Sequence, residues 1–310
     1  MPLHSLPVEV LHIILHFVGS ESLRKHEACC LLVSKWWCKL AEPVLLKDLV
    51  LNANRLRQIP ERALERLKLF LQRLTIDMKH SPDWHADDGL NDGFIQLLTR
   101  CVHLTAFILR APSQFDPDKP LAPVTNYLES WSPTSLFDAL HLSTISDLVI
   151  DTCGSEFQSG VHVCPRIALK IPSLRSIRLR MHNICPRVLE LERDSKIESI
   201  IINLSLKEPD RFHAGFSRHC TEVKSAYELY DDMVMAASNV ARSQPGIKML
   251  RILCHKHPYL EMMTRDCING TQMILSDDSE DWGDDGLPDP DDEEISDQDL
   301  FTADSEDERL

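Results

Sequence analysis

The sequence is poor in glycine, with 10 among 310 residues, and this argues against a glycine-rich barrel or sandwich. It contains no apolar run of the roughly 18 residues that a membrane span requires. The apolar segment at its start has no basic flank before it and no small-residue cleavage site after it, so a signal peptide is not indicated. The ten cysteines are therefore expected to stay reduced, in the cytoplasm, the nucleus or both.

Motifs for enzymes and metal sites are equally scarce. The sequence has no GxSxG, HExxH, GxxxxGK[ST] or GxGxxG motif, and no CxxC pair that would indicate a zinc ribbon or a thioredoxin-type site. Two groups have metal-ligand chemistry, and each is equally consistent with ordinary strand or loop residues: Cys254, His255 and His257, and the group His80, Asp83, His85, Asp87 and Asp88. We therefore expect no cofactor, no metal and no catalysis, with an α/β enzyme of unrecognised site as an alternative.

An excess of charge of one sign is absent from most of the chain and is concentrated at its end. Residues 277–310 contain 17 acidic residues and one basic residue. The net charge of the whole chain is -15, so the residues before this segment are together close to neutral. No basic patch stands out, so binding to nucleic acid is not expected. Residues 276–310 are predicted to form a disordered acidic tail, in which Ser296 and Ser305 are candidate phosphorylation sites for an acidophilic kinase.

What the sequence does contain is an unusually apolar start, LPVEVLHIILHFV at residues 6–18. Pro7 suits the first turn of a helix, and Gly19-Ser20 is expected to end it. One helical face carries Leu6, Val10, Ile13, Ile14 and Phe17, while Leu11, Leu15 and Val18 lie outside that stripe. A helix with two apolar faces in so small a segment indicates that one face meets something else.

Two more helices are predicted before residue 45. One runs from about Glu21 to Leu32, and the other contains VSKWWCKLA and is expected to end at Pro43. Together with the first helix, this segment resembles an F-box. The likeness lies in the Leu-Pro-x-Glu start, the paired aliphatic residues and the later Val-x-x-x-Trp-x-x-Leu-Ala helix.

The resemblance implies a function as well as a fold. In that family three helices bind a Skp-type adaptor, which connects them to a cullin-RING ubiquitin ligase. Trp36 stands where the family more often has a basic or polar residue and is left out of the implied adaptor face. That face comprises Leu6, Pro7, Val10, Leu11, Ile14, Leu15, Val33 and Trp37. Two alternatives stay open: an interaction protein that uses the adaptor outside any ligase, and a helical cap packed wholly on its own domain.

The spacing of apolar residues along the sequence changes after Pro43. Short apolar, partly β-branched segments alternate with helix-like runs, which predicts strand-helix crossovers and a parallel sheet. All seven predicted strands also fit the pattern L-x-x-L-x-L, although about as many matches are expected by chance. The strands are LLKDLVL, RLTIDM, HLTAFILR, ISDLVID, LRSIRLRM, IESIIINL and GIKMLRIL.

A local repeat carries more weight than that pattern. Cys-Pro-Arg occurs at Cys164 and Cys185, 21 residues apart, each time followed by a helix-like run and a strand. With the start of the chain, this resembles the degenerate leucine-rich-repeat bodies of fungal-type F-box proteins. The predicted fold class is α/β, with an F-box over residues 1–45, an irregular leucine-rich-repeat-like solenoid over 46–275 and the acidic tail. A compact α/β domain with irregular crossovers is the competing fold.

The resemblance assigns the body to recognition of a protein substrate for ubiquitination, with no membrane partner, but the sequence names no substrate. Long insertions at residues 79–91, 111–131 and 205–221 are the expected places for specificity. Their aromatic residues serve equally well to tether loops to the core. The arginines Arg175, Arg178 and Arg180 would suit a phosphate, or simply a half-exposed strand. The candidate substrate contacts are Trp84, Phe115, Trp131, Phe212 and Phe216.

Overall fold

The fold is described from a computed structural model of the chain. Among the residues it describes, none of the helices is both long and apolar enough to cross a membrane. The described residues are 6–25, 34–52, 55, 59–78, 95–111, 128, 133–142, 144–153, 155–157, 161–192, 195–206, 215–256, 261–275, 282–283 and 286–288.

Two helical segments form the start of the described chain. Helix α1 covers Val8–Lys25, and its backbone leaves helical geometry at Gly19, where φ is 75°. This confirms the predicted break, because glycine adopts positive φ without a steric penalty. Most of the predicted second helix after residue 25 lies outside the described residues.

Helix α3 covers Lys35–Lys47 and differs from the prediction at its end. The Ser34 side chain caps it by accepting a hydrogen bond from the Trp37 backbone N–H at 3.0 Å. Pro43 lies inside the helix rather than closing it, so the predicted end was wrong. The last turn persists because Val44 and Leu45 are buried, and this packing offsets the hydrogen bond that proline removes.

The body contains one ten-stranded sheet whose strands follow one another in chain order. The first seven pair in parallel and the last three are antiparallel, so the predicted mixed α/β class and all seven predicted strands are confirmed. The strands are β1 Asp48–Leu51, β2 Arg73–Asp77, β3 Ala106–Arg110, β4 Asp147–Asp151, β5 Ser176–Arg180, β6 Ser199–Asn203, β7 Met249–Lys256, β8 Glu261–Asp266, β9 Gln272–Leu275 and β10 Leu287–Pro288.

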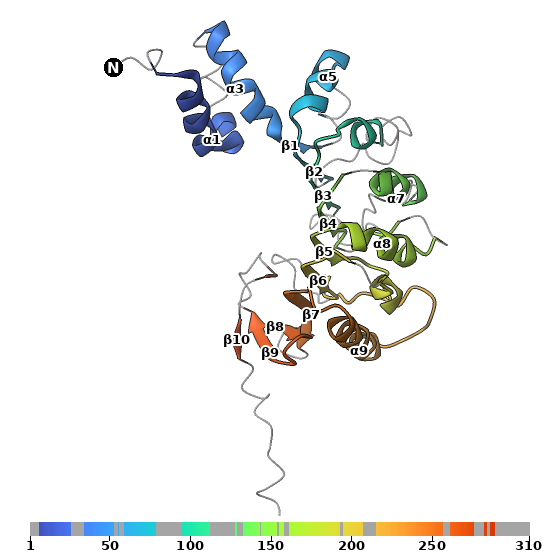
Figure 1. Ribbon diagram of the computed structural model, residues 1–310. Helices are drawn as coiled ribbons and strands as arrows, with labels where there is room; N and C mark the ends of the chain where they lie inside the picture. The colour runs from blue at the N-terminus through green and yellow to red at the C-terminus, as the bar shows by residue number, and fades with distance from the viewer. Residues whose placement is uncertain are drawn as a thin grey trace, which may run out of the picture.

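Helices connect the parallel strands and lie along one side of the sheet, as Figure 1 shows for α5, α7, α8 and α9. A further helical stretch occupies residues 95–100. Because these helices lie on the same side, none of the described helices covers the opposite face of the sheet along β1–β5 (Figure 1). The remaining segments are α5 Glu61–Phe70, α7 Pro133–Leu142, α8 Cys164–Lys170, η3 Ile171–Ser173, η4 Pro186–Leu189 and α9 Ala226–Ser243.

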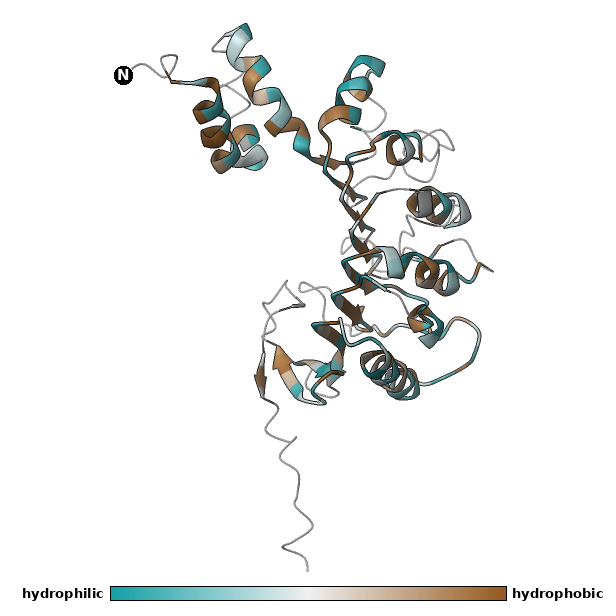
Figure 2. Ribbon diagram, viewed as in Figure 1, coloured by the Kyte–Doolittle hydropathy of each residue, from teal (hydrophilic) through white to brown (hydrophobic). Residues whose placement is uncertain are grey.

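The register of the parallel strands aligns equivalent apolar residues into two rows that face these helices. Strand residues alternate between the two faces of a sheet, so residues two positions apart point to the same face. Each strand therefore places one such residue in each row. Figure 2 shows the apolar colour continuing from strand to strand. One row, almost wholly buried, contains Leu74, Phe107, Leu148, Ile177, Ile200 and Leu250, and the other contains Leu51, Ile76, Leu109, Ile150, Leu179, Ile202 and Ile252.

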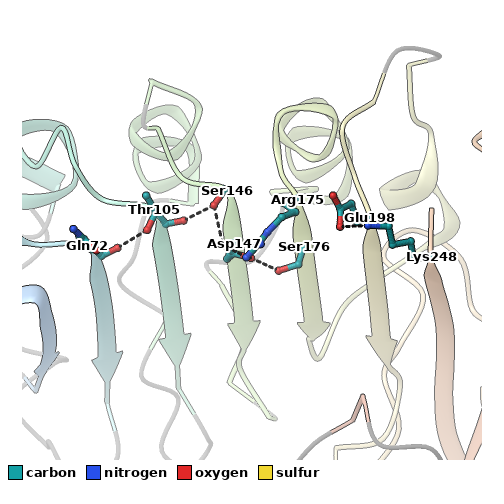
Figure 3. A network of polar contacts seen from close by, with 8 residues as sticks. All are labelled: Gln72, Thr105, Ser146, Asp147, Arg175, Ser176, Glu198 and Lys248. Carbon is teal, nitrogen blue, oxygen red and sulfur yellow. Dashed lines mark hydrogen bonds and ion pairs between the residues drawn. The ribbon is translucent and has the colours of Figure 1, made fainter. Parts of the chain in front are cut away.

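A backbone relay joins the residues that precede successive strands. The backbone N–H of each such residue donates to the carbonyl of the equivalent residue one strand earlier, over 2.7 or 2.8 Å. Side chains reinforce this relay in Figure 3, where Thr105 donates to the Gln72 carbonyl and Lys248 pairs with Glu198 at 2.9 Å. The relay runs through Lys47, Gln72, Thr105, Ser146, Arg175, Glu198 and Lys248.

The C-terminal strands cover the other face of the sheet at one end. Ile201 and Leu253 are buried there with Leu275, and Met262 and Trp282 pack against them. The Trp282 ring also lies 5.0 Å from the Arg180 guanidinium, and Arg251 donates to the Gly283 carbonyl at 2.9 Å. This part of the predicted disordered tail is therefore placed against the sheet, and β10 pairs with β9. Ser296 and Ser305 lie outside the described residues.

The two rows predict an uneven stability profile. Leu179 in β5 is fully buried, whereas the side chain of Leu169 in α8 is 63% exposed. We expect Leu179→Ala to lower the free energy of unfolding by about 2–5 kcal/mol, since it leaves a cavity between sheet and helix. The matched Leu169→Ala should change it by no more than about 0.5 kcal/mol. Urea denaturation of both variants measures this, and equal losses would contradict the assigned register.

The polar contacts around Asp147 predict a pH dependence. Burial alone would raise the pKa of Asp147, but hydrogen bonds from Ser176, Ser146 and Arg175 outweigh it and hold the pKa below its usual 3.8. The resulting stabilisation is complete above the unfolded-state pKa and is lost as pH falls through the lower folded-state value. Wild-type chain should thus exceed Asp147→Asn in stability at neutral pH, and the gap should close in acid.

Urea denaturation between about pH 7 and pH 2 measures that gap. The control is Asp138→Asn, which removes a surface ion pair to Arg166 of 2.7 Å outside the relay. A gap for Asp147→Asn that stays constant down to the lowest pH would show that these hydrogen bonds do not favour the ionised carboxylate.

Candidate protein-interaction site

The N-terminal helices enclose a small core of their own, separate from the core under the sheet. The exposed fraction of each side chain in it is below a tenth, and Leu6 and Trp37 pack at its edge. A core of so few residues is only marginally stable. The two helices therefore cannot bury all of their apolar side chains in it. The core consists of Leu11, Leu15, Leu23, Leu40, Ala41, Val44 and Leu45.

Another face of α1 carries an apolar stripe whose side chains are all exposed in the described part of the chain. Its members are spaced by three and four residues, as one face of a helix requires. The exposed fraction reaches 88% for Phe17 and 56% for Ile13, and much of α1 has the apolar colour in Figure 2. We call this the α1 stripe, and it consists of Val10, Ile13, Ile14 and Phe17.

The predicted adaptor face is only partly the α1 stripe. Val10, Ile14 and Pro7 are exposed and Leu6 is half-buried, so these four residues are accessible at the surface of the described chain. Leu11 and Leu15, in contrast, are 0% and 2% exposed, because they fill the core between α1 and α3. These two residues cannot be reached by a partner in this arrangement, so the predicted face is corrected by leaving them out.

The two tryptophans of α3 lie side by side at the same end of the helical pair. Trp37 is half-buried, and its indole N–H is buried without a hydrogen-bond partner among the described residues. Trp36, which the resemblance did not assign to the adaptor, is 45% exposed, with its ring centroid 6.2 Å from that of Trp37. Val33, which the resemblance did assign, lies outside the described residues. An aromatic surface therefore adjoins the apolar core.

The helical pair is fixed to the sheet rather than joined through a linker. Helix α3 ends at Lys47 and β1 begins at Asp48. The Arg24 guanidinium donates to the carbonyls of Leu45 and Asp48, and Ser20 donates to the Asp48 carboxylate at 3.2 Å. Burial at this junction lowers the pKa of Arg24, and the nearby Asp48 carboxylate opposes that shift. A partner bound to α1 would thus be held in a defined orientation to the body.

The predicted substrate contacts are mostly not tested by the structure. Trp84, Phe115, Trp131 and Phe212 lie outside the described residues. Phe216 is half-buried, and its ring meets that of His255 edge-on at 6.4 Å, with an interplanar angle of 87°. Phe216 therefore packs on the chain's own core, which fits the tethering alternative better than a substrate contact.

The metal-ligand candidates named from the sequence are mostly not tested by the structure. Cys254 and His255 are buried, and His255 hydrogen-bonds Ser205, whereas His257 and the group around His80 lie outside the described residues. A different group does come together. Four potential ligand atoms within the described chain lie within 4.8 Å of one another, on His162, Cys164, Cys185 and Cys220.

Sequence reasoning missed this group because its members are 2, 21 and 35 residues apart in the chain. The available signal was the repeated Cys-Pro-Arg, which was interpreted as a structural repeat only. In the folded chain, hydrogen bonds from the Cys164 and Cys220 thiols lower the pKa of Cys185.

Comparison of the chain with protein-family models, with curated proteins and with solved structures found no match. The role of the α1 stripe must therefore be inferred from its own chemistry.

The two faces of α1 should respond differently to polar substitution. Ile13→Ser places a hydroxyl at a site that is 56% exposed, so we expect the free energy of unfolding to change by about 0.5 kcal/mol or less. Leu11→Ser empties a fully buried site and buries a hydroxyl, so a loss of about 3 kcal/mol or more is expected. Thermal denaturation followed by circular dichroism tests this. A large loss for Ile13→Ser would mean that the chain itself covers the stripe.

Proposed function

We propose that this chain is the substrate-recognition subunit of a ubiquitin ligase of the Skp/cullin/F-box type. The helical pair would bind a Skp-type adaptor through the α1 stripe, Pro7 and the aromatic end of α3. The sheet body would hold a protein target. Transfer of ubiquitin would be carried out by other subunits, so this chain would contribute proximity and orientation rather than catalytic groups.

The observation that carries this proposal is the exposed apolar stripe on a helix that has already filled its own core. An exposed Phe17 and Ile13 beside Val10 and Ile14 form a contiguous apolar surface, which in stable chains marks an interface. Its position in the F-box-like segment supports an adaptor as the partner. The spacing of the stripe also suits an anchor set laid along a groove.

The body supports the other half of the proposal. Seven parallel strands in chain order, with their helices on one side, favour a leucine-rich-repeat-like solenoid over a compact sheet with irregular crossovers. The uncovered face of the sheet presents a half-exposed row across four strands, formed by Thr75, Ile108, Val149 and Arg178. A mixed apolar and polar surface of this kind suits a folded protein target.

Phosphate recognition receives less support. Arg175 pairs with the Asp147 carboxylate at 3.1 Å, and Arg180 pairs with Asp151 at 2.6 Å. Arg180 is also covered by Trp282. Carboxylate partners already occupy two of the three arginines, so we do not assign a phosphopeptide to this surface.

Co-expression with a Skp-type adaptor tests the docking half of the proposal. We expect a one-to-one complex for the wild-type chain and affinity weaker by on the order of 100-fold for Val10→Ser with Ile14→Ser. Each substitution removes an apolar contact at the centre of the interface, where about 1.4 kcal/mol corresponds to tenfold in affinity. Gel filtration and calorimetry measure the complex.

The matched control is Leu69→Ser with Val102→Ser, which changes two exposed apolar side chains of the body, each 63% exposed. This control should bind the adaptor like wild type. A folded wild-type chain that ignores the adaptor would overturn the proposal. An adaptor complex that never recruits a cullin subunit would instead favour an interaction protein that acts outside the ligase.

A further inference from the structure

The four clustered side chains of His162, Cys164, Cys185 and Cys220 lie in the segments that follow three neighbouring strands, with Cys164 as the first residue of α8. His162 and Cys164 follow β4, Cys185 follows β5 and Cys220 follows β6. Neighbouring parallel strands end at the same edge of a sheet, so these three segments are brought together by the topology. Ligand sites of α/β proteins commonly lie at this carboxyl edge.

Backbone contacts fix the cysteine loops against one another. The Arg218 N–H donates to the His182 carbonyl at 2.7 Å, and the Ile184 N–H donates to the Arg218 carbonyl at 3.0 Å. Ser217 adds a hydrogen bond from its hydroxyl to the Met181 carbonyl at 2.7 Å. These three bonds lie just before Cys185 and Cys220 in their respective loops. The two sulfurs therefore occupy positions set by the scaffold.

The distances suit tetrahedral coordination. Nε2 of His162 lies 3.0 Å from Sγ of Cys185, and Sγ of Cys164 lies 3.5 Å from Sγ of Cys220. Bonds of about 2.3 Å from zinc to sulfur and about 2.0 Å to nitrogen require ligand atoms roughly 3.5–3.8 Å apart. All four atoms lie within 4.8 Å of one another, so shifts of side chains alone would complete the tetrahedron.

The donor set selects among metals. Three thiolates and one imidazole are soft and intermediate ligands, which favour zinc over magnesium, calcium or manganese. Cys164 and Cys185 are fully buried or nearly so, and His162 and Cys220 are half-buried. Four protein ligands leave no open position for water, which is the arrangement of a structural rather than a catalytic zinc site.

The site also has a route for the ion. A pocket of about 240 Å³ lies beside it, and His162 and Cys220 form part of its wall together with Glu156 and His182. Metal could thus enter from solvent without unfolding of the loops.

We propose that His162, Cys164, Cys185 and Cys220 bind one structural zinc ion. Binding replaces three S–H bonds by Zn–S bonds, releases three protons and gives a complex with a net charge of -1. The ion joins the loops after β4, β5 and β6 and so braces the carboxyl edge of the sheet. This proposal is independent of the proposed adaptor binding, which would involve α1 and α3.

Zinc content of the full-length chain tests the proposal. The chain is produced in zinc-supplemented medium, purified under reducing conditions without chelator, and analysed by mass spectrometry for zinc per chain. We expect about one zinc ion in wild type and less than about a tenth of that in Cys185→Ser. Cys101→Ser is the matched control, because its thiol is also buried but lies outside the cluster, and it should keep the ion.

Two further measurements separate loss of a ligand from loss of the fold. Cobalt substituted into the wild-type chain should give the intense visible bands of tetrahedral coordination and a thiolate charge-transfer band, with no variant needed. His162→Cys should retain the ion through four thiolates, whereas His162→Ala should bind it at least about tenfold more weakly.

Three outcomes would overturn the proposal. One is a folded, reduced wild-type chain that takes up no zinc in titration. Another is a Cys164–Cys220 disulfide in freshly purified protein, detected as an intact mass lower by two hydrogens. The third is equal zinc in Cys185→Ser and Cys101→Ser, because the ion would then be bound elsewhere.

Discussion

The backbone relay that precedes the strands fixes their register, and most of the structure depends on that register. Each link fixes the start of one strand relative to the previous one, from Lys47 through Lys248. With that register fixed, every strand presents its apolar residues at the same two positions, and the helices have a continuous surface to cover. The same register places the loops after β4, β5 and β6 side by side. The proposed zinc site is a consequence of this alignment.

The N-terminal helices depend on the relay in a different way. In the first hydrogen bond of the relay, the backbone N–H of Gln72 donates to the carbonyl of Lys47, the last residue of α3. No linker residue separates α3 from β1, and the Arg24 side chain of α1 donates hydrogen bonds to the carbonyls of Leu45 and Asp48 on both sides of the junction. Because α1 and α3 have a separate core, the pair can present one face outward while its anchor stays rigid. Such a division suits a chain that holds two partners at a set separation.

Much of this could be predicted because the signals were local. Strand-helix alternation and the break at Gly19 each depend on a few neighbouring residues. Pro43 misled because tertiary packing of Val44 and Leu45 outweighs a local preference. The two faces of α1 were visible in its spacing, but which face is buried depends on α3. The cysteine cluster could not be read from spacing, since sheet register alone brings residues 164, 185 and 220 together.

The outermost strand has a consequence for self-association. A row of parallel strands leaves open edges, and exposed backbone groups at an edge invite pairing with another chain. Here the direction reverses after β7, and the array finishes in β10, which is only two residues long and contains Pro288. Proline has no backbone N–H to donate, so this edge offers a poor template for a further strand. The acidic residues that flank β10 in the sequence add like-charge repulsion between copies. The strand array therefore ends in a feature that opposes edge-to-edge aggregation.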